Sequence, residues 1–530
     1  MQKRVHVYEL DGESRTVELL DDEQFSSATL MALKPSHRVS AVQSLVNMAG
    51  LVSGRSSREL GSRGPVVASR ANRENSGDAT VGVYDAMFGR DSLRIASMLH
   101  RFRPELETAT VEYWAARQGT VHNSANHEEP GKIAHEYRDD DDPQRAVNEA
   151  KGFVYPDFGS MDSTPLWLIA AGRRIAADPS FASTTVEHVE GERLTIATAM
   201  HRALDRMEAW RSSNPEGLIE ADASVGAYGA FPYWKDSPDA YHQSNGELAQ
   251  GNVSSVEVMG YAFQAYDDLA KLAREHPGLE LDSEKLAGSA EQVKSAIFDH
   301  FWIESEGFFA QGVERRTPES DVEPLVVKSS NMGYLLSTGI FDGDGDGRNL
   351  ASIREQLVGT LFSDDMLCPA GIRTLGANEV RFRPSSYHNG ASWPMDTYTI
   401  AEGLERDYPR LAKVLNDRVR ADCHNFLPEF LPGTDDPNPT PGDVVVRVDA
   451  VNSKGKEINR SAEKVPEPMQ GWTAAALAAV KMNARELDAE IRDRSVNQTR
   501  ETRFEERLLM SLEQRNVLAL HAAKEMGMQL

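Results

Sequence analysis

The chain has 530 residues, with 57 Lys and Arg against 82 Asp and Glu, so its formal net charge is −25. This acidic balance argues against a nucleic-acid binder, which needs a basic face to displace counterions, and against docking on anionic lipid. Hydrophobic residues make up 40% and charged residues 26% of the chain, as in ordinary folded proteins, and a chain of this length buries a large core.

The cysteine content and the N-terminus bear on the cellular compartment. The chain contains two cysteines, Cys368 and Cys423, which do not make a disulfide framework and favour a reducing environment. Residues 1–20 lack the apolar segment of a signal peptide, and no stretch approaches the roughly 18 uncharged apolar residues of a membrane span. The sequence therefore predicts a cytoplasmic protein with neither a membrane nor a nucleic-acid partner.

Residues 1–80 are expected to form an extension ahead of the main domain. Apolar and polar residues alternate on both sides of Asp11-Gly12, which predicts a β-hairpin over residues 3–20. A short helix is predicted over residues 38–51. Residues 52–80 are rich in Ser, Arg and Gly and are expected to form a loop.

From residue 84 onward the apolar spacing is helical, and the predicted helices come in six pairs. In chain order these pairs are 91–101 with 105–118, 163–177 with 194–212, 254–275 with 284–301, 329–338 with 349–361, 390–406 with 408–427, and 471–483 with a helix in 486–526. Links within a pair tend to be short. Links between pairs are long: 119–162, 213–253, 302–328, 362–389 and 428–470.

Six consecutive helical hairpins predict an all-α fold, an (α/α)6 toroid over residues 81–487. In a ring of antiparallel hairpins the long links between pairs emerge on one face, and long loops in compact domains are usually functional. We therefore expect the functional site on that face.

Residues 488–530 are expected to form a C-terminal helical extension with an apolar stripe through Phe504, Leu508, Leu509 and Leu512. This stripe fits packing on its own domain, and a homo-oligomer contact through the same helix stays open.

The long loops mix aromatic and acidic residues, which is the composition that a sugar site needs. Aromatic rings stack on the apolar faces of sugars, and polar groups bind the hydroxyls. Cleavage of a glycosidic bond needs one carboxyl that protonates the leaving oxygen and one carboxylate that activates water or attacks the sugar. Asp236 and Glu429 come from different long loops. Asp236 follows Tyr233 and Trp234, whose apolar rings would raise its pKa towards the acid role.

Seven motifs in one order resemble a known enzyme family. They are YDAMFGRDSL (84–93), EEPGKIAHEYR (128–138), MDSTPLWL (161–168), YWKDSPD (233–239), YHNGASWP (387–394), LPEF (427–430) and QGWTAAA (470–476). The combination resembles (α/α)6-barrel glycosidases of the glycogen-debranching, amylo-α-1,6-glucosidase type. It is also similar to the bacterial glucosylglycerate and mannosylglycerate hydrolases of glycoside hydrolase family 63.

The resemblance implies an inverting α-glycosidase that needs no cofactor. It implies that Asp236 is the general acid and Glu429 the general base, and that Arg90 and Asp91 bind the sugar in the cleavage subsite. Gln470 is implied to line the same site. The other candidate sugar contacts are aromatic and polar residues of the long loops: Tyr233, Trp234, Tyr387, His388, Asn389, Trp393 and Trp472.

Structural roles compete with several of these assignments. Arg90 and Asp91 fit a buried ion pair at a helix start, and Trp393 and Trp472 fit core aromatic residues. Two departures from the family pattern also bear on the site. Pro238 follows the Trp-x-Asp-Ser motif where the family often has Gly, and an insertion at 434–466 is expected to reshape the leaving-group subsite.

We expect no metal ion. The histidines of loop 119–162 lack tight ligand spacing, and neither an HExxH motif, a CxxC motif nor a glycine-rich phosphate loop occurs. The run FDGDGDGRN places Asp342, Asp344 and Asp346 like the first half of a calcium loop, but its twelfth position is Ile353 rather than the required Glu. A solvated acidic turn is favoured, and a weak structural calcium site stays open.

The expected substrate is a small α-glucoside, either an oligosaccharide or a glucosylglycerate-like solute. Two alternatives within the glycosidases are a debranching amylo-α-1,6-glucosidase acting on a glycogen-like polymer and an α-mannosidase of the mannosylglycerate type. A terpene cyclase would need a DDxxD metal site, which the aspartate clusters here do not form. A pseudoenzyme or sugar-binding module would be favoured by loss of either carboxyl, and both are present.

Overall fold

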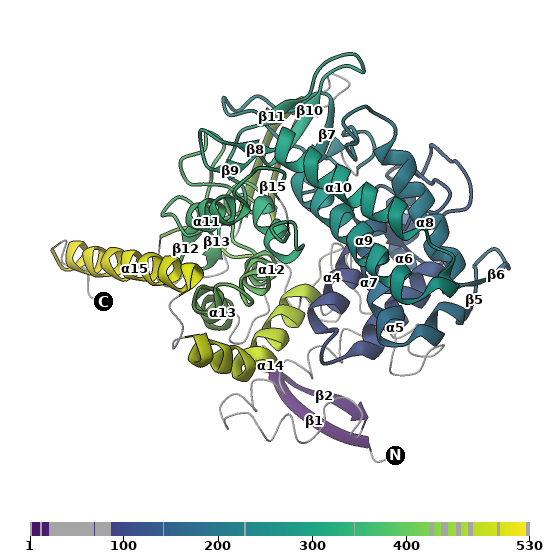
Figure 1. Ribbon diagram of the computed structural model, residues 1–530, viewed down its shortest axis with the longest axis horizontal. Helices are drawn as coiled ribbons and strands as arrows, with labels where there is room; N and C mark the ends of the chain where they lie inside the picture. The colour runs from purple at the N-terminus through teal and green to yellow at the C-terminus, as the bar shows by residue number, and fades with distance from the viewer. Residues whose placement is uncertain are drawn as a thin grey trace.

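The computed structural model describes residues 3–10, 13–20, 68, 86–140, 142–226, 229–343, 345–422, 429–435, 444–451, 457–464, 470–494 and 499–525 (Figure 1). The helix predicted over 38–51 and residue Asp344 lie outside these ranges, and of loop 52–80 only residue 68 is described.

An inner ring of six helical elements surrounds the axis of the molecule. In order they are α4 (Gly89–Leu99), α7 (Ser163–Ala177), α9 (Val256–Glu275), the 3-10 helix η5 (Ser330–Ser337), α12 (Pro394–Leu404) and α14 (Gly471–Arg494). Each element packs against the next one, and α14 packs back against α4, so the ring is closed (Figure 1). The predicted (α/α)6 toroid is confirmed.

Outer helices follow the inner elements along the chain and pack on them. They are α5 (Pro104–Ala115), α8 (Ile196–Arg211), α10 (Ser283–His300), α11 (Leu350–Leu361) and α13 (Pro409–Asp422). Along the chain each inner element is followed by its outer helix, as in the predicted pairs. Where the sequence predicted an α-helix over 329–338, the structure has the 3-10 helix η5, which is a short, tighter element.

Local chemistry accounts for several of the helix starts. The side chain of Asp282 accepts hydrogen bonds from the backbone N–H groups of Glu284 and Lys285 at 3.1 and 3.0 Å, which caps α10. Pro104 and Pro394 stand at the first positions of α5 and α12, where proline fits because that N–H has no intrahelical partner.

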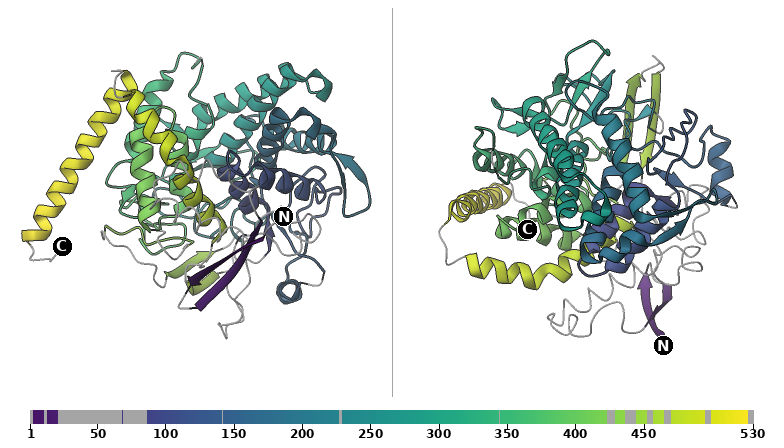
Figure 2. Two further views of the ribbon diagram at one scale, coloured as in Figure 1. Left: turned by 90° about the horizontal axis from the view of Figure 1, so that it is seen from below. Right: turned by 45° about the vertical axis from the view of Figure 1, so that its right-hand side comes forward.

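The last helix, α15 (Arg500–Glu525), lies at the edge of the molecule (Figure 2). Its apolar stripe packs against the main hydrophobic core, and Phe504 contacts Tyr408 with ring centroids 5.5 Å apart. Glu505 Oε1 accepts hydrogen bonds from the backbone N–H groups of Arg410 and Leu411, at 2.7 and 3.1 Å, at the start of α13. The stripe therefore packs on its own chain, and α15 supplies a cap to a neighbouring helix.

Short elements occupy the termini and the links. The predicted N-terminal hairpin is confirmed, since β1 (Lys3–Leu10) and β2 (Glu13–Leu20) pair antiparallel. A second hairpin, β14 (Val444–Val451) with β15 (Glu457–Lys464), lies in the insertion at 434–466, where the sequence predicted no strands.

The remaining short strands pair antiparallel within the links: β3 (Met87–Phe88) with β4 (Glu136–Tyr137), β5 (Thr185–Glu187) with β6 (Arg193–Thr195), β8 (Trp302–Ile303) with β9 (Phe308–Phe309), β12 (Leu367–Cys368) with β13 (Gly371–Ile372), and β7 (Asn252–Ser255) with β10 (Gly312–Arg315) and β11 (Glu323–Leu325). Three short helical turns complete the described elements: α6 (Pro143–Glu149), η2 (Pro179–Ser183) and η4 (Pro277–Leu279). Among the described residues, the helices all fall short of the length and apolarity that a membrane span requires.

Candidate active site

The long links meet at the ends of the inner helices where those helices begin. Arg90 and Asp91 stand in the first turn of α4, Asp162 directly precedes α7, and Gln470 directly precedes α14. Helix N-termini carry partial positive charge, which suits a site rich in carboxyl groups. The links that lead to these helices bring in Asp236, the 387–389 segment and Glu429, so the predicted clustering of long loops around one site is observed.

Arg90 is the cation at the centre of this site. Its Nε donates to Asp162 Oδ2 at 2.5 Å and its Nη1 donates to Asp236 Oδ2 at 3.0 Å. The side chains of Arg90 and Asp162 are 4% and 1% exposed, whereas that of Asp236 is 35% exposed. The Arg90 guanidinium therefore binds both the accessible carboxyl of Asp236 and the buried carboxyl of Asp162.

This geometry differs from the ion pair between sequence neighbours that Arg90-Asp91 suggested. Arg90 binds residues that lie 72 and 146 positions away along the chain. Asp162 was absent from the candidate site residues, although it lies in the MDSTPLWL motif that contributes to the resemblance. This motif is the feature of the sequence from which Asp162 could have been identified as a site residue.

Asp91 is buried beside Arg90, and its environment favours the protonated form. Burial raises the pKa of Asp91 to about 7, and Asp236, Glu429 and Asp162 add to the rise while Arg90 opposes it. One arginine thus faces several carboxyls, so full ionisation of the cluster is unfavourable. The charges of Asp236 and Glu429 both act on Asp91, so the two candidate catalytic carboxyls influence the same buried group.

Glu429 is 1% exposed and is held by an aromatic neighbour. The hydroxyl of Tyr387 donates a hydrogen bond to Glu429 Oε1. The Tyr387 ring is itself fixed by Trp393 and Phe430, with centroids 4.7 and 5.1 Å away. A buried carboxylate with its orientation set by a phenol is suited to accept a proton from water.

An aromatic wall lines the site beside the carboxyls. Trp234 packs edge-on against His388 and Trp393, with centroids 5.4 and 5.8 Å away, and Trp472 packs edge-on against Trp393 at 5.5 Å. Ser237 Oγ lies 2.6 Å from His388 Nδ1, which fixes the imidazole. The buried indole Nε1 groups of Trp234 and Trp472 have no hydrogen-bond partner within the described ranges.

For Trp393 and Trp472 the sequence left two alternatives, a core aromatic residue or a sugar contact, and their positions are compatible with both. Trp393 and Trp472 are 1% and 5% exposed and belong to the hydrophobic core, while they also back the aromatic wall. Burial alone does not separate packing from ligand contact at such positions.

Three predicted site residues have local structural partners. Tyr233 is fully buried, its ring packs edge-on against Tyr241 at 5.5 Å, and its hydroxyl donates to the Val253 carbonyl oxygen, so it has core partners, and its sugar contact stays a prediction. Asn389 Nδ2 donates to the carbonyl oxygen of Asp239 at 2.9 Å and joins two loops. Gln470 Oε1 accepts from the Gly471 N–H at 2.9 Å at the start of α14.

The acidic run near residue 342 has a cationic partner. Arg406 donates to both carboxylate oxygens of Asp342, at 2.8 and 2.6 Å. Within the ranges that the structure describes, no group of three or more His, Cys, Asp or Glu side chains is arranged to hold a metal ion.

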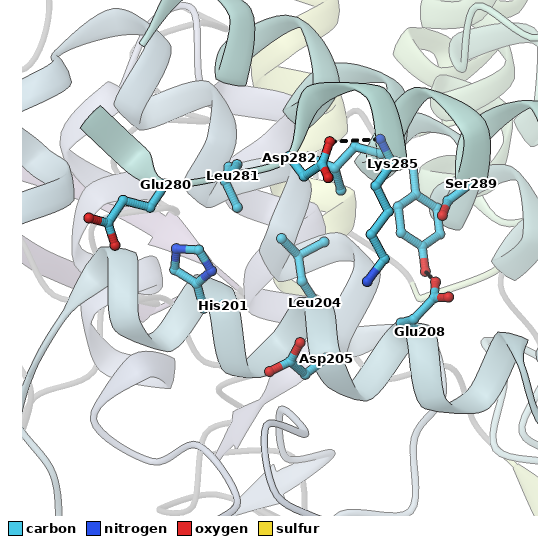
Figure 3. A pocket seen from close by; sticks show the side chains of 11 residues that line it. His201, Leu204, Asp205, Glu208, Glu280, Leu281, Asp282, Lys285 and Ser289 are labelled. Atoms are coloured by element: carbon cyan, nitrogen blue, oxygen red, sulfur yellow. Dashed lines mark hydrogen bonds between the residues drawn. The ribbon is translucent and has the colours of Figure 1, made fainter. Parts of the chain in front are cut away.

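Two cavities lie away from the predicted site residues. One, of about 130 Å³, is bordered by α8 and the start of α10, where His201 and Leu204 lie opposite Leu281 and Asp282 (Figure 3). The other, of about 340 Å³, is lined by residues of the inner helices that include Arg94, Arg173 and Glu402.

The chain is similar to a known family of glycoside hydrolases over much of its length. Residues 84–427 match the family model described as mannosylglycerate hydrolase MGH1-like glycoside hydrolase domain. A comparison with curated proteins gives no match.

Two solved structures of the GH63 mannosylglycerate hydrolase from Thermus thermophilus are similar to the chain. The complex with Tris and D-glycerate has a TM-score of 0.50 and 14% identity, and the match covers 84% of this chain and 99% of the other. The complex with glucose has a TM-score of 0.51 and 15% identity, and it covers 83% and 98% of the two chains. At these identities the likeness supports the fold.

Proposed function

We propose that this chain, which belongs to the mannosylglycerate hydrolase MGH1-like glycoside hydrolase family, is an inverting, exo-acting α-glycosidase for a small α-glycoside. Membership of the family confirms the predicted resemblance and makes the protein a glycoside hydrolase. The stereochemistry, the substrate and the catalytic residues are our proposal. The observation that carries it is that Arg90 donates to Asp236 at 3.0 Å, while the charges of Asp236 and Glu429, from two separate links, both act on the adjacent buried carboxyl of Asp91.

Asp236 is proposed as the general acid that protonates the leaving oxygen. Its side chain is the accessible member of the Arg90-centred group, so it can reach a substrate while Asp162 stays buried. We propose that Asp236 carries a proton in the substrate complex; one arginine faces several acids there, and the neighbouring Asp91 already favours its protonated form. Arg90 then stabilises the carboxylate that remains after the transfer.

Glu429 is proposed as the general base that activates water. The Tyr387 hydroxyl occupies one carboxylate oxygen and fixes the plane of the group. An inverting pair works across a gap of about 6.5–9.5 Å, which leaves room for the attacking water between the base and the sugar. Asp91, on which the charges of both carboxyls act, is proposed to hold the sugar in the cleavage subsite.

The substrate proposal rests on the aromatic wall and the carboxyl groups beside it. Aromatic rings next to carboxyl groups suit a single pyranose and its hydroxyls, and we propose a small α-glucoside as the substrate. A second candidate, an α-mannoside of the mannosylglycerate type, is favoured by the description of the family model. The related Thermus enzyme has been seen with D-glycerate and with glucose, which supports a small hydroxylated substrate.

The decisive experiment combines a substrate screen with proton NMR of the anomeric signals. Purified protein is incubated with sucrose, kojibiose, trehalose, isomaltose, glucosylglycerate, mannosylglycerate and a glycogen limit dextrin. We expect the fastest release from a small glycoside, with the β-anomer of the sugar formed first. An initial α-anomer would refute inversion, and fastest release from limit dextrin would favour a debranching enzyme instead.

The residue assignments are tested with isosteric variants. Asp236→Asn and Glu429→Gln should each lower kcat about 10²–10⁴-fold, the usual contribution of a general acid or base. Circular dichroism and thermal unfolding should stay close to those of the wild type. Retention of more than about a tenth of the activity would contradict the role of the substituted residue.

A further inference from the structure

We propose that Lys235 is a positioning residue that fixes Asp236 for proton transfer, because its ammonium anchors the segment carrying this carboxyl to two other segments of the toroid. The inference rests on the proposed role of Asp236. Lys235 lies outside the set of residues that border the sugar, and its effect would pass through its neighbour in the chain.

The first observation is the geometry of the ammonium. Lys235 Nζ donates to Ser329 Oγ at 2.6 Å and to the carbonyl oxygen of Thr374 at 2.5 Å. Ser329 directly precedes η5, and Thr374 follows strand β13. Three segments that lie 94 and 139 residues apart along the chain are therefore joined at one point.

The second observation is the contrast between Lys235 and its two neighbours. The side chain of Asp236 is 35% exposed and Trp234 belongs to the aromatic wall, whereas Lys235 is 0% exposed. The ammonium also lies 5.2 Å from the centroid of the Trp234 ring. Lys235 therefore anchors from inside the core a stretch of chain whose flanking side chains border the site.

The third observation is the electrostatic cost of this arrangement. Burial lowers the pKa of Lys235 to about 7, although Asp396 and Glu257 oppose the change. Burial also raises the pKa of Asp396 to about 6, against the attraction of Lys235. An apolar side chain of similar volume would fill the same space without this desolvation cost, so packing alone does not account for a lysine.

Together these contacts constrain Asp236 from two sides. Arg90 holds the carboxyl at 3.0 Å, and Lys235 holds the adjacent backbone. A general acid acts only within hydrogen-bond reach of the leaving oxygen, and a displacement of about 1 Å can cost about 10²-fold in rate. Loss of the anchor should therefore impair proton donation more than sugar binding.

The test compares two substrates that differ in their need for an acid. One is the O-glycoside on which the wild-type enzyme is most active, and the other is the α-glycosyl fluoride of the same sugar. Fluoride is a weak base that leaves without a proton, so its release bypasses the general acid. The variants are Lys235→Met and Asp236→Asn, with Lys294→Met as a matched control, because Lys294 is another buried lysine that donates to a carbonyl, on the outer helix α10.

We expect Lys235→Met to lower kcat for the O-glycoside about 10–100-fold, with KM within about threefold of the wild-type value. Hydrolysis of the fluoride should stay within about threefold of the wild type. Asp236→Asn should show the same selectivity with a larger loss, and Lys294→Met should leave both rates unchanged.

Equal losses of Lys235→Met on the two substrates would show a structural role and overturn the inference, as would full activity on both. If Lys235→Met does not fold, Ser329→Ala, which removes one acceptor of the ammonium, replaces it under the same criteria. The proposed function fails separately: an Asp236→Asn variant that keeps its activity on the O-glycoside contradicts the acid assignment whatever Lys235 does.

Discussion

The raised pKa of Asp91 predicts how the free energy of unfolding depends on pH, which can be measured directly. Burial raises the pKa of Asp91 from its ordinary 3.8 to about 7 in the folded protein. The folded state therefore binds a proton that the unfolded state has already released between these pH values. As pH rises through this range the wild type loses stability, by about 4 kcal/mol in total.

Asparagine has nearly the same shape as protonated aspartic acid and does not ionise. The substitution Asp91→Asn should therefore raise thermal stability relative to the wild type, and the gain should grow from about pH 4.5 to about pH 8.5. With an unfolding entropy of ~2.1 cal/mol/K per residue over the 530 residues, about 4 kcal/mol corresponds to about 4 °C in Tm. Activity should fall at the same time, because the proposed sugar-binding carboxyl is lost.

The assay is scanning calorimetry of the wild type and Asp91→Asn across this pH range, with the exposed Asp205 changed to Asn as the control. Other buried acids titrate in both proteins, so the difference between their Tm values isolates Asp91. Parallel Tm curves for the wild type and Asp91→Asn would refute the reasoning, since they would mean that Asp91 carries the same charge folded and unfolded.

Three further substitutions test the contacts around the site and the outer ring. Tyr387→Phe removes the hydroxyl that donates to Glu429, and kcat should fall about 10-fold or more in steady-state assays. Arg90→Lys keeps the charge but loses the fork that reaches Asp236, so kcat should fall by about 10²-fold while the protein stays folded. Glu505→Ala leaves two N–H groups at the start of α13 without their acceptor, which should cost about 1 kcal/mol and lower the Tm in calorimetry without changing KM.

The helical architecture could be predicted because apolar residues recur with helical spacing in the predicted pairs. The predicted helix 163–177 matches α7 (Ser163–Ala177), and the predicted 284–301 matches α10 (Ser283–His300) within a residue. The strands at Val444–Val451 and Glu457–Lys464 escaped prediction because the insertion was judged by its composition rather than by its alternation. Periodicity also does not distinguish an α-helix from the 3-10 helix η5, because both bury one face.

The site was less predictable, because contacts across the ring decide which side chains reach it. Tyr233 and Trp234 are adjacent aromatic residues, and the sequence predicts a sugar contact for both. In the structure the Tyr233 ring packs against Tyr241, whereas the Trp234 ring belongs to the aromatic wall. Asp162 is bound to Arg90 across 72 residues, a distance at which no local pattern operates. The roles of Asp236 and Glu429 stay predictions, although the charges of both act on the buried Asp91.

The closure of α14 onto α4 has a consequence for how the molecule is made. Arg101, just after α4, donates to Asn483 of α14 at 3.2 Å, across 382 residues of sequence. At about 5–20 residues per second, translation of the intervening chain takes about 20–80 s, during which one flank of α4 lacks its partner. The contacts between α4 and α14 have a large sequence separation, so they are the last of the ring to form. The proposed site takes Glu429 and Gln470 from the last part of the chain, and it is therefore complete only after that part has been made.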